Sequence, residues 1–154
     1  MKQVAFIRGI GPENPNMHGA KLKEFFEKLG FKNVKTLLSS GNVLFESEKV
    51  NRSLLESLIE ENLPKMLGFS RITIVRSYDD LKKIVTSDPF KGVEDAPTSR
   101  LNVTFLKKGG EIFTVIDTIN TGTTKIMSDL EKKYGKDITT RTLKTVTRVI
   151  KKME

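Results

Sequence analysis

The stretch Ser39-Ser40-Gly41-Asn42 is the first of three in this sequence whose residue types are suited to holding anions. Backbone N–H groups at a glycine-containing turn, with serine hydroxyls beside them, form a small concavity that binds anions. The commoner reason for Gly and Asn together is that both tolerate the positive φ of a tight turn. Ser40, Gly41 and Asn42 are therefore candidate anion-binding residues, with turn geometry as the alternative.

The second stretch is the loop Gly9–Gly19, which follows Arg8 and contains Asn16. An arginine at a strand end, an Asn-rich loop and a helix start together suit a phosphate or carboxylate, because a helix N-terminus presents free N–H groups. Arg8 and Asn16 are candidates on this ground, and a plain connecting loop is the alternative. The glycine spacing fits neither a dinucleotide-binding loop nor a Walker loop, so no cofactor is predicted.

The third stretch is the C-terminal segment 125–154, which has nine Lys/Arg and four Asp/Glu and so supplies five of the net charge of +8. On a helical wheel its cations gather on one face: Arg141, Lys144, Arg148, Lys151 and Lys152. Leu143, Val146, Val149, Ile150 and Met153 gather opposite. Such a basic stripe can follow a phosphate backbone. The alternative is a solvated helix face, where cations near the C-terminus are favoured by the helix dipole.

The sequence gives little support for catalysis. His18 is the single histidine and has no recognisable nucleophile or orienting partner. The absence of cysteine excludes disulfides, thiol catalysis and thiolate metal sites. The carboxylates of Glu24, Glu27, Asp79 and Asp80 fall on helix faces expected to be solvated, so no metal site is predicted. Whether the protein is an enzyme stays open.

The length of 154 residues suits one ordinary domain or two closely packed small ones. The apolar run before Arg8 is far too short for a signal peptide, and no later stretch approaches a membrane span. We therefore expect a cytoplasmic protein without membrane contact. The oligomeric state cannot be predicted from these features.

Hydrophobic periodicity in the first half predicts alternating strands and helices. Strands are expected at 3–8, 34–39, 43–47 and 71–76, and helices at 18–29 and from Asn51 to Pro64, where proline ends or kinks the helix. The order β-α-β-β-α-β is that of a ferredoxin-like sandwich. Residues 1–76 are accordingly predicted to form a ferredoxin-like subdomain.

Residues 77–154 are predicted to form a second, smaller α+β subdomain. A capping box at Ser77–Asp80 opens a helix, and strands at 101–107 and 111–117 form a hairpin. Two helices are expected to close the chain, one around 126–134 and one from about Arg141 to Met153. The predicted fold class is α+β.

Seven short motifs in this order resemble the family catalogued as domain of unknown function 1697. They are Ala5–Ile10, Leu29–Phe31, Ser40–Val43 with Phe45, Gly68–Phe69, Asp88–Phe90, Arg100–Leu106, and Thr140–Arg141 with Thr145–Val146. The resemblance is strong over residues 1–106 and weak after them. It implies a ferredoxin-like first part and a second α+β part, and no established activity.

The sequence departs from the family's pattern in its C-terminal half. Gly109-Gly110 stands where the family has a longer segment with another helix, so this half is shortened. Residues 141–146 read Arg-Thr-Leu-Lys-Thr-Val and lack the Asn-Trp-Asn of the family. Any site that this motif forms in relatives is therefore in doubt here.

Two functions remain open. RNA-recognition domains share the predicted strand order but stack bases on exposed aromatics, and the central strands here have only Phe6 and Phe45. We expect that sheet face to be buried against the second half, at Phe105 and Phe113. The first hypothesis is a non-enzymatic binding module for anionic partners, nucleic acid or another polyanion. The alternative is a small-molecule enzyme or ligand-binding protein, with a cleft between the subdomains lined by the loop after strand one, the hairpin turn and Thr104.

Overall fold

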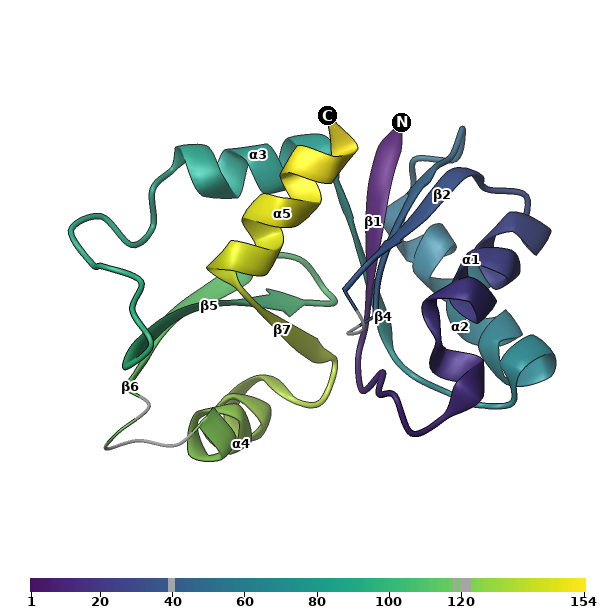
Figure 1. Ribbon diagram of the computed structural model, residues 1–154. Coiled ribbons are helices and arrows are strands. Elements are labelled where there is room, and N and C mark those ends of the chain that lie inside the picture. Colours follow the sequence, from purple (N-terminus) through teal and green to yellow (C-terminus); the bar gives the residue numbers. More distant parts are fainter. Residues whose placement is uncertain (39–40, 118, 120–122) are drawn as a thin grey trace.

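The protein, described here by a computed structural model covering residues 1–38, 41–117, 119 and 123–154, contains two antiparallel sheets. Figure 1 shows the two sheets side by side, with the first sheet and its two long helices on one side and the second sheet with three helices on the other. Ser39 and Ser40 lie outside the described residues. The predicted α+β class is confirmed.

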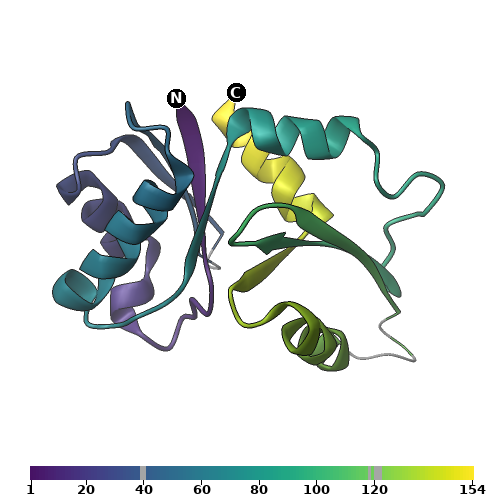
Figure 2. The ribbon, with the colours of Figure 1, turned by 180° about the vertical axis from the view of Figure 1, so that it is seen from behind.

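The first sheet has the predicted ferredoxin-like topology. Its strands are β1 (Lys2–Ile7), β2 (Lys32–Leu37), β3 (Asn42–Glu46) and β4 (Thr73–Ser77), in the order β2-β3-β1-β4. A turn of 3-10 helix (Pro15–Met17) precedes α1 (Gly19–Lys28), and α2 is Arg52–Leu67. Figure 2 shows both helices on the face of this sheet that is turned away from the second half.

Pro64 was expected to end or to kink helix α2. The helix does not end there. The Asn51 side chain caps its start by accepting from the Leu54 N–H at 3.1 Å, and the helix continues to Leu67 before Gly68 at φ +78° ends it. Leu63 and Leu67 are both buried on either side of the proline. Their packing holds the last turn in place although Pro64 lacks the N–H for one ladder bond.

The second half contains a strand that the sequence interpretation missed. Its elements are α3 (Tyr78–Thr86), β5 (Ser99–Leu106), β6 (Glu111–Asp117), α4 (Thr123–Tyr134), β7 (Ile138–Thr142) and α5 (Leu143–Met153). The sheet order is β6-β5-β7, and β7 pairs antiparallel with β5 from Leu106↔Ile138 to Asn102↔Thr142. The run Ile-Thr-Thr-Arg-Thr is dominated by β-branched residues, which is the pattern that could have identified it.

The capping box predicted at the start of α3 is present. The Ser77 hydroxyl accepts from the Asp80 N–H at 3.1 Å, and the Asp80 carboxylate accepts from the Ser77 N–H at 2.9 Å. Two N–H groups that the first turn leaves without helical partners are satisfied in this way. The reciprocal bonds fix the sharp passage from β4 directly into α3.

The second face of the first sheet is buried, as expected. Alternation along β1 sends Ala5 and Ile7 to the helices α1 and α2, and Val4 and Phe6 to the other side. Phe6 stacks on Phe105 with ring centroids 4.6 Å apart, which confirms the predicted role of Phe105.

The expectation for Phe113 is wrong. Its side chain is 38% exposed and packs edge-on against Phe90, at 5.8 Å between centroids, instead of meeting the first sheet. Alternation along β6 explains the difference, since successive side chains of a strand point to opposite faces.

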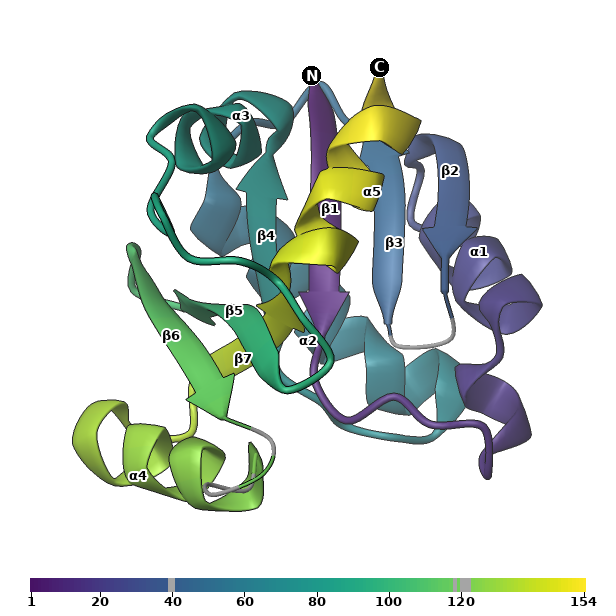
Figure 3. The ribbon, with the colours of Figure 1, turned by 60° about the vertical axis from the view of Figure 1, so that its left-hand side comes forward.

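Helix α5 lies across the first sheet. Figure 3 shows it passing in front of β1 and β3. Its buried residues are Val146, Val149, Ile150 and Met153, which belong to the same cluster as Phe6 and Phe105. The Lys2 ammonium donates to the Met153 carbonyl at 2.6 Å, which holds the two ends of the chain together. The one-sided apolar pattern predicted for this helix is therefore confirmed.

The turn between β2 and β3 leaves no space for a side chain at Gly41. Its φ is +78°, and a Cβ built there would lie 2.5 Å from the Ile7 carbonyl oxygen and 2.7 Å from Ile10 Cγ1. The Ile7 N–H also donates to the Gly41 carbonyl at 2.9 Å. Gly41 is thus required by close packing on β1 as well as by its backbone conformation.

We predict that Gly41→Ala destabilises the protein much more than Gly68→Ala. Gly68 has the same φ of +78°, but an added Cβ would meet nothing within 4 Å. Its substitution therefore lowers the unfolding free energy only through the strain of alanine in a left-handed conformation, by about 1 kcal/mol. At Gly41 the clash with backbone adds at least about 2 kcal/mol. Urea unfolding of both variants measures the difference, and equal costs would show that packing at Gly41 is unimportant.

Candidate functional site

Arg141 joins the two halves of the molecule from β7. Its Nε donates to Asn42 Oδ1 at 2.7 Å, one Nη donates to Thr139 Oγ1 at 2.8 Å, and the other donates to the Ile7 carbonyl at 3.1 Å. Its guanidinium carbon lies 5.3 Å from the centre of the Phe6 ring. One side chain therefore contacts β1, the start of β3 and its own strand.

The predicted place of Arg141 on the basic helix stripe is wrong. It precedes α5, which begins at Leu143, and its half-buried side chain bonds to oxygens of both halves. Burial lowers the pKa of Arg141 to about 10, because the charged form loses its hydration. Hydrogen bonds to carbonyl and amide oxygens offset this loss.

Gly41 and Asn42, the described residues of the hairpin turn, form hydrogen bonds with other parts of the protein. Asn42 is 1% exposed, donates through Nδ2 to the Leu37 carbonyl at 3.0 Å and accepts from Arg141. The Gly41 carbonyl accepts from Ile7. Ser40 lies outside the described residues. Anion binding at this turn stays a prediction, and the contacts that are present support the structural alternative.

Arg8 also connects the halves. Its guanidinium forms an ion pair with Glu131 of α4 and donates to the Lys136 carbonyl at 2.8 Å. Asn16 lies apart from it, donating through Nδ2 to the Leu67 carbonyl at 2.9 Å. The structure thus brings Arg8 to the second half and places Asn16 against the end of α2.

A cavity of about 230 Å³ lies where Arg8 and Arg141 approach each other, lined also by Gly9 and Glu131. The loop after β1 therefore borders a hollow between the halves, as the small-molecule alternative expected. Thr104 does not take part in it, since its side chain is fully buried and its hydroxyl lies 2.7 Å from that of Thr140. Glu131 neutralises Arg8, and the other cation of the lining, Arg141, donates its N–H groups to Asn42, Thr139 and Ile7. The cavity therefore has only modest attraction for an anion.

The remaining cations of the predicted stripe are solvent-exposed. Lys144, Arg148 and Lys152 follow at intervals of four residues and form a row on one flank of α5, with Lys151 on the adjacent flank. Lys152 lines a shallow hollow of about 170 Å³ between α5 and the strands β1 to β3, together with Lys2 and Lys35. We refer to Lys2, Lys35, Lys144, Arg148 and Lys152 as the basic groove. Sequence analysis found the helix row but not the two lysines of the sheet.

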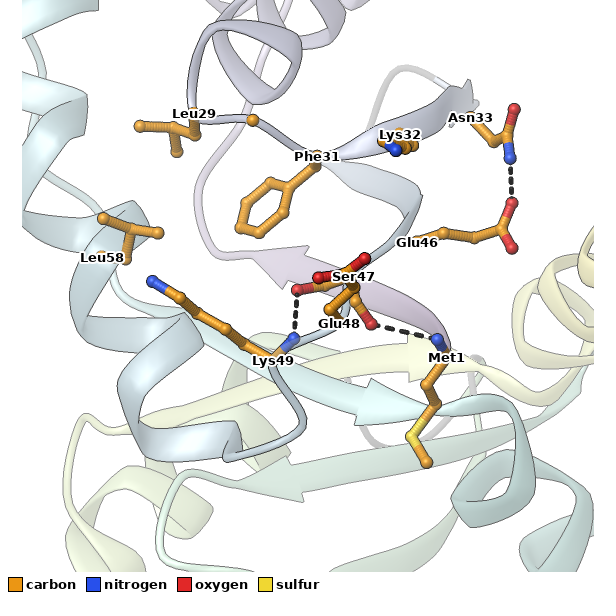
Figure 4. Close-up of a pocket in the computed structure, with 11 residues that line it drawn as sticks. Met1, Leu29, Phe31, Lys32, Asn33, Glu46, Ser47, Glu48, Lys49 and Leu58 are labelled. Carbon is orange, nitrogen blue, oxygen red and sulfur yellow. Dashed lines mark hydrogen bonds between the residues drawn. The ribbon is translucent and has the colours of Figure 1, made fainter.

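Another pocket, of about 440 Å³, lies beside the start of β2 and is shown in Figure 4. Leu29, Phe31 and Leu58 form its apolar part. Polar groups around it bond to one another: Asn33 donates to Glu46, and the Met1 ammonium donates to the Ser47 carbonyl at 3.0 Å. These groups pair along the rim and do not converge on one point, so the pocket indicates no particular chemistry.

A buried carboxylate and a buried guanidinium lie at the outer edge of β4. Glu56 is 2% exposed and accepts from the Val75 N–H at 2.9 Å. Arg76 is 1% exposed and donates to the Leu106 carbonyl at 2.7 Å, with Glu111 3.3 Å from its Nε. Glu60 accepts from the Thr73 N–H at 2.9 Å. Carboxylates of α2 therefore satisfy outward N–H groups of an edge strand, which blocks pairing with another chain.

Sequence reasoning missed Glu56, although its spacing from buried residues could have identified it. Ile59 and Leu63 follow three and seven residues later and are fully buried, which places Glu56 on the inner face of α2. Burial raises the pKa of Glu56, opposed by the Val75 hydrogen bond and by the charges of Lys107, Arg76 and Arg52.

Within the described parts of the chain, no group of three or more His, Asp or Glu side chains could hold a metal ion. The helices in those parts also include none with the length and apolarity needed to cross a membrane.

The family model described as "Protein of unknown function (DUF1697)" matches residues 1–134 of the chain. The chain belongs to this family. No functionally curated protein is similar to it in sequence. Among solved structures, a conserved bacterial protein from Streptococcus pneumoniae has 18% sequence identity and a TM-score of 0.73, with 99% of this chain and 98% of that one covered. This DUF1697 member therefore shares its fold, both halves included, with that protein.

We predict strong energetic coupling between Arg141 and Asn42. Arg141→Met leaves several buried oxygens without this donor, so we expect a loss of about 3 kcal/mol in unfolding free energy. Asn42→Ala is expected to cost about 2 kcal/mol, and the double variant less than the sum by at least about 0.5 kcal/mol. Arg148→Met, at an exposed position, is the control and should change stability by less than about 0.5 kcal/mol. Additive costs in urea unfolding would contradict the coupling.

We predict that the benefit of Glu56 to stability is lost as pH rises. Since the folded-state pKa is raised above the ordinary value of 4.5, the folded protein holds this proton more tightly than the unfolded chain. The resulting stabilisation is complete below pH 4.5 and disappears as pH passes the folded-state pKa. Glu56→Gln keeps an oxygen for Val75 and has no proton to lose. Its unfolding free energy should therefore rise relative to wild type with increasing pH, and parallel pH profiles would refute this.

Proposed function

We propose that this protein binds anionic polymers, nucleic acid in the first place, along the basic groove. The observation that supports the proposal is a shallow hollow lined by Lys2, Lys35 and Lys152. Arg148 and Lys144 continue the row of Lys152 along α5 at intervals of four residues. Phosphate contacts from such cations supply most of the affinity in non-specific nucleic-acid binding.

The row on α5 has a suitable length for a short run of phosphates. From Lys144 to Lys152 the helix rises about 12 Å, at about 1.5 Å per residue. A nucleic-acid strand places a phosphate about every 3.4 Å along the duplex axis, so the row spans roughly three to four of them. The apolar side of α5 is buried, which holds the row at a fixed position above the sheet.

The acidic residues of the groove have partners of their own. Glu46 accepts from Asn33. Glu154 accepts from the Tyr78 hydroxyl at 3.3 Å and lies 3.8 Å from the Lys82 ammonium. Lys82 offsets the charge of Glu154, whereas the neutral Asn33 leaves Glu46 charged. The five cations of the groove outnumber these two carboxylates, so its potential is positive.

The groove offers no aromatic platform for reading bases. Phe6 lies in the interior against Phe105, and Phe45 points into the core below the sheet. Base stacking of the RNA-recognition type is therefore excluded at these two residues. Binding through the groove is accordingly expected to show little sequence preference and to weaken steeply with salt.

We predict that the variant Lys144→Glu/Arg148→Glu/Lys152→Glu loses at least about tenfold in affinity for a fluorescent oligonucleotide at low salt. Three lost phosphate contacts should also reduce the slope of log K against log salt by about 2 to 3. The control Lys21→Glu/Lys23→Glu/Lys65→Glu makes the same charge change on exposed positions of α1 and α2. Fluorescence anisotropy over a salt series, with single- and double-stranded probes, measures both quantities.

Two results would overturn the proposed function. The first is no retention of either probe by the wild-type protein at low salt. The second is an equal loss of affinity in the groove variant and in the control, because that would show a response to net charge alone.

A further inference from the structure

A second hollow between the two halves lies on a different part of the surface. It has a volume of about 370 Å³ and is lined by Ser53, Glu56, Ser57, Leu106, Lys107, Lys108, Tyr134 and Asp137. These residues come from the first turns of α2, the tip of the β5–β6 hairpin and the link from α4 to β7. Figure 2 shows that hairpin pointing toward the first half. The volume and the position between two halves are those of small-molecule sites.

The lining of this cavity is polar and contains two cations, Lys107 and Lys108, and two acids, Glu56 and Asp137. Lys108 is exposed at its rim, and Lys107 forms an ion pair with Glu60. Arg52 lies beside the hairpin tip, where its guanidinium approaches Gly109. In the described parts of the chain, no carboxylate lies within ion-pair distance of Lys108 or Arg52. Positive charge is therefore available to a ligand at this side of the cavity.

Hydroxyl groups and a buried carboxyl face the same space. Ser53 and Ser57 are separated by one helical turn, with Glu56 between them on the inner side of α2. Glu56 uses Oε2 for Val75, and its side chain has no other hydrogen bond among the described residues. A carboxyl group that is only 2% exposed is costly unless its remaining hydrogen-bonding capacity is met. A ligand hydroxyl in the cavity would meet it.

We propose that this cavity binds a small hydroxylated anion, of the hydroxy-acid or sugar-phosphate class. The anionic group lies at Lys108, on the side of the cavity where Arg52 approaches the hairpin tip, and the ligand hydroxyls lie at Ser53, Ser57 and Glu56. The site shares no residue with the basic groove, so it stands or falls independently of nucleic-acid binding. It gives the two halves a joint function that neither provides alone.

Three probes of matched chemistry test the proposal on the full-length protein. Gluconate has both the carboxylate and the hydroxyls, sorbitol has the hydroxyls alone, and acetate has the carboxylate alone. In amide NMR titrations, gluconate should shift the signals of residues 53–57 and 106–108 and bind at least about tenfold more tightly than either control. Absence of shifts there, or equal binding of the three probes, would overturn the proposal.

Two variants at exposed positions distinguish the contact to the anionic group from the contacts to the hydroxyls. Lys108→Gln should lower gluconate affinity about tenfold, toward that of sorbitol, whereas Ser53→Ala/Ser57→Ala should lower it toward that of acetate. Lys23→Gln, an exposed lysine on α1, is the control and should bind gluconate as wild type does. Uniform effects of all three variants would contradict the site, and unchanged oligonucleotide binding would show that the basic groove is unaffected.

Discussion

The hydrogen bonding of the Arg141 guanidinium between the two sheets is the interaction on which the rest of the structure depends. This one group donates to oxygens of Asn42 and Ile7 in the first half while its strand pairs with β5 in the second. The stack of Phe6 on Phe105 lies next to it, and both rings are fully buried. Several directional hydrogen bonds thus hold the guanidinium in place and give the junction a single geometry. Apolar contacts alone are not directional and would allow the two halves to shift against each other.

This junction constrains the surfaces that could bind ligands. With β7 fixed to the first sheet, α5 follows directly and lies across β1 and β3, which places its cations beside Lys2 and Lys35. On another side, Arg76 bonds to the Leu106 carbonyl and brings the β5–β6 hairpin to α2, where the second cavity forms. Both proposed sites consequently consist of residues from both halves. Arg141 and Arg76, each bonded to a backbone carbonyl of the other half, hold together the segments that form them.

Much of the fold could be predicted because its local patterns are strong. The alternation around Gly41-Asn42, the capping box at Ser77 and the one-sided apolar pattern of α5 each arise from interactions close in sequence. The five-residue strand β7 was missed because a short β-branched run between helices has little periodicity. That omission also misplaced Arg141, which a helical wheel assigned to a solvated face. The candidate sites were predicted only in part, since Lys2 and Lys35 join the basic groove, and Glu56 the second cavity, from elements remote in the chain.

The sequence by itself determined the α+β class, the ferredoxin-like order of the first half, the family and the excess of positive charge near the C-terminus. Only the tertiary structure decided which cations are exposed, which are buried, and which acids stand beside them. Arg141 and Lys144 are three positions apart and alike in charge, yet Arg141 is half-buried and bonded between the sheets, whereas Lys144 faces solvent. The physical reason is that exposure and electrostatic environment depend on the packing of distant segments, which composition and periodicity do not specify.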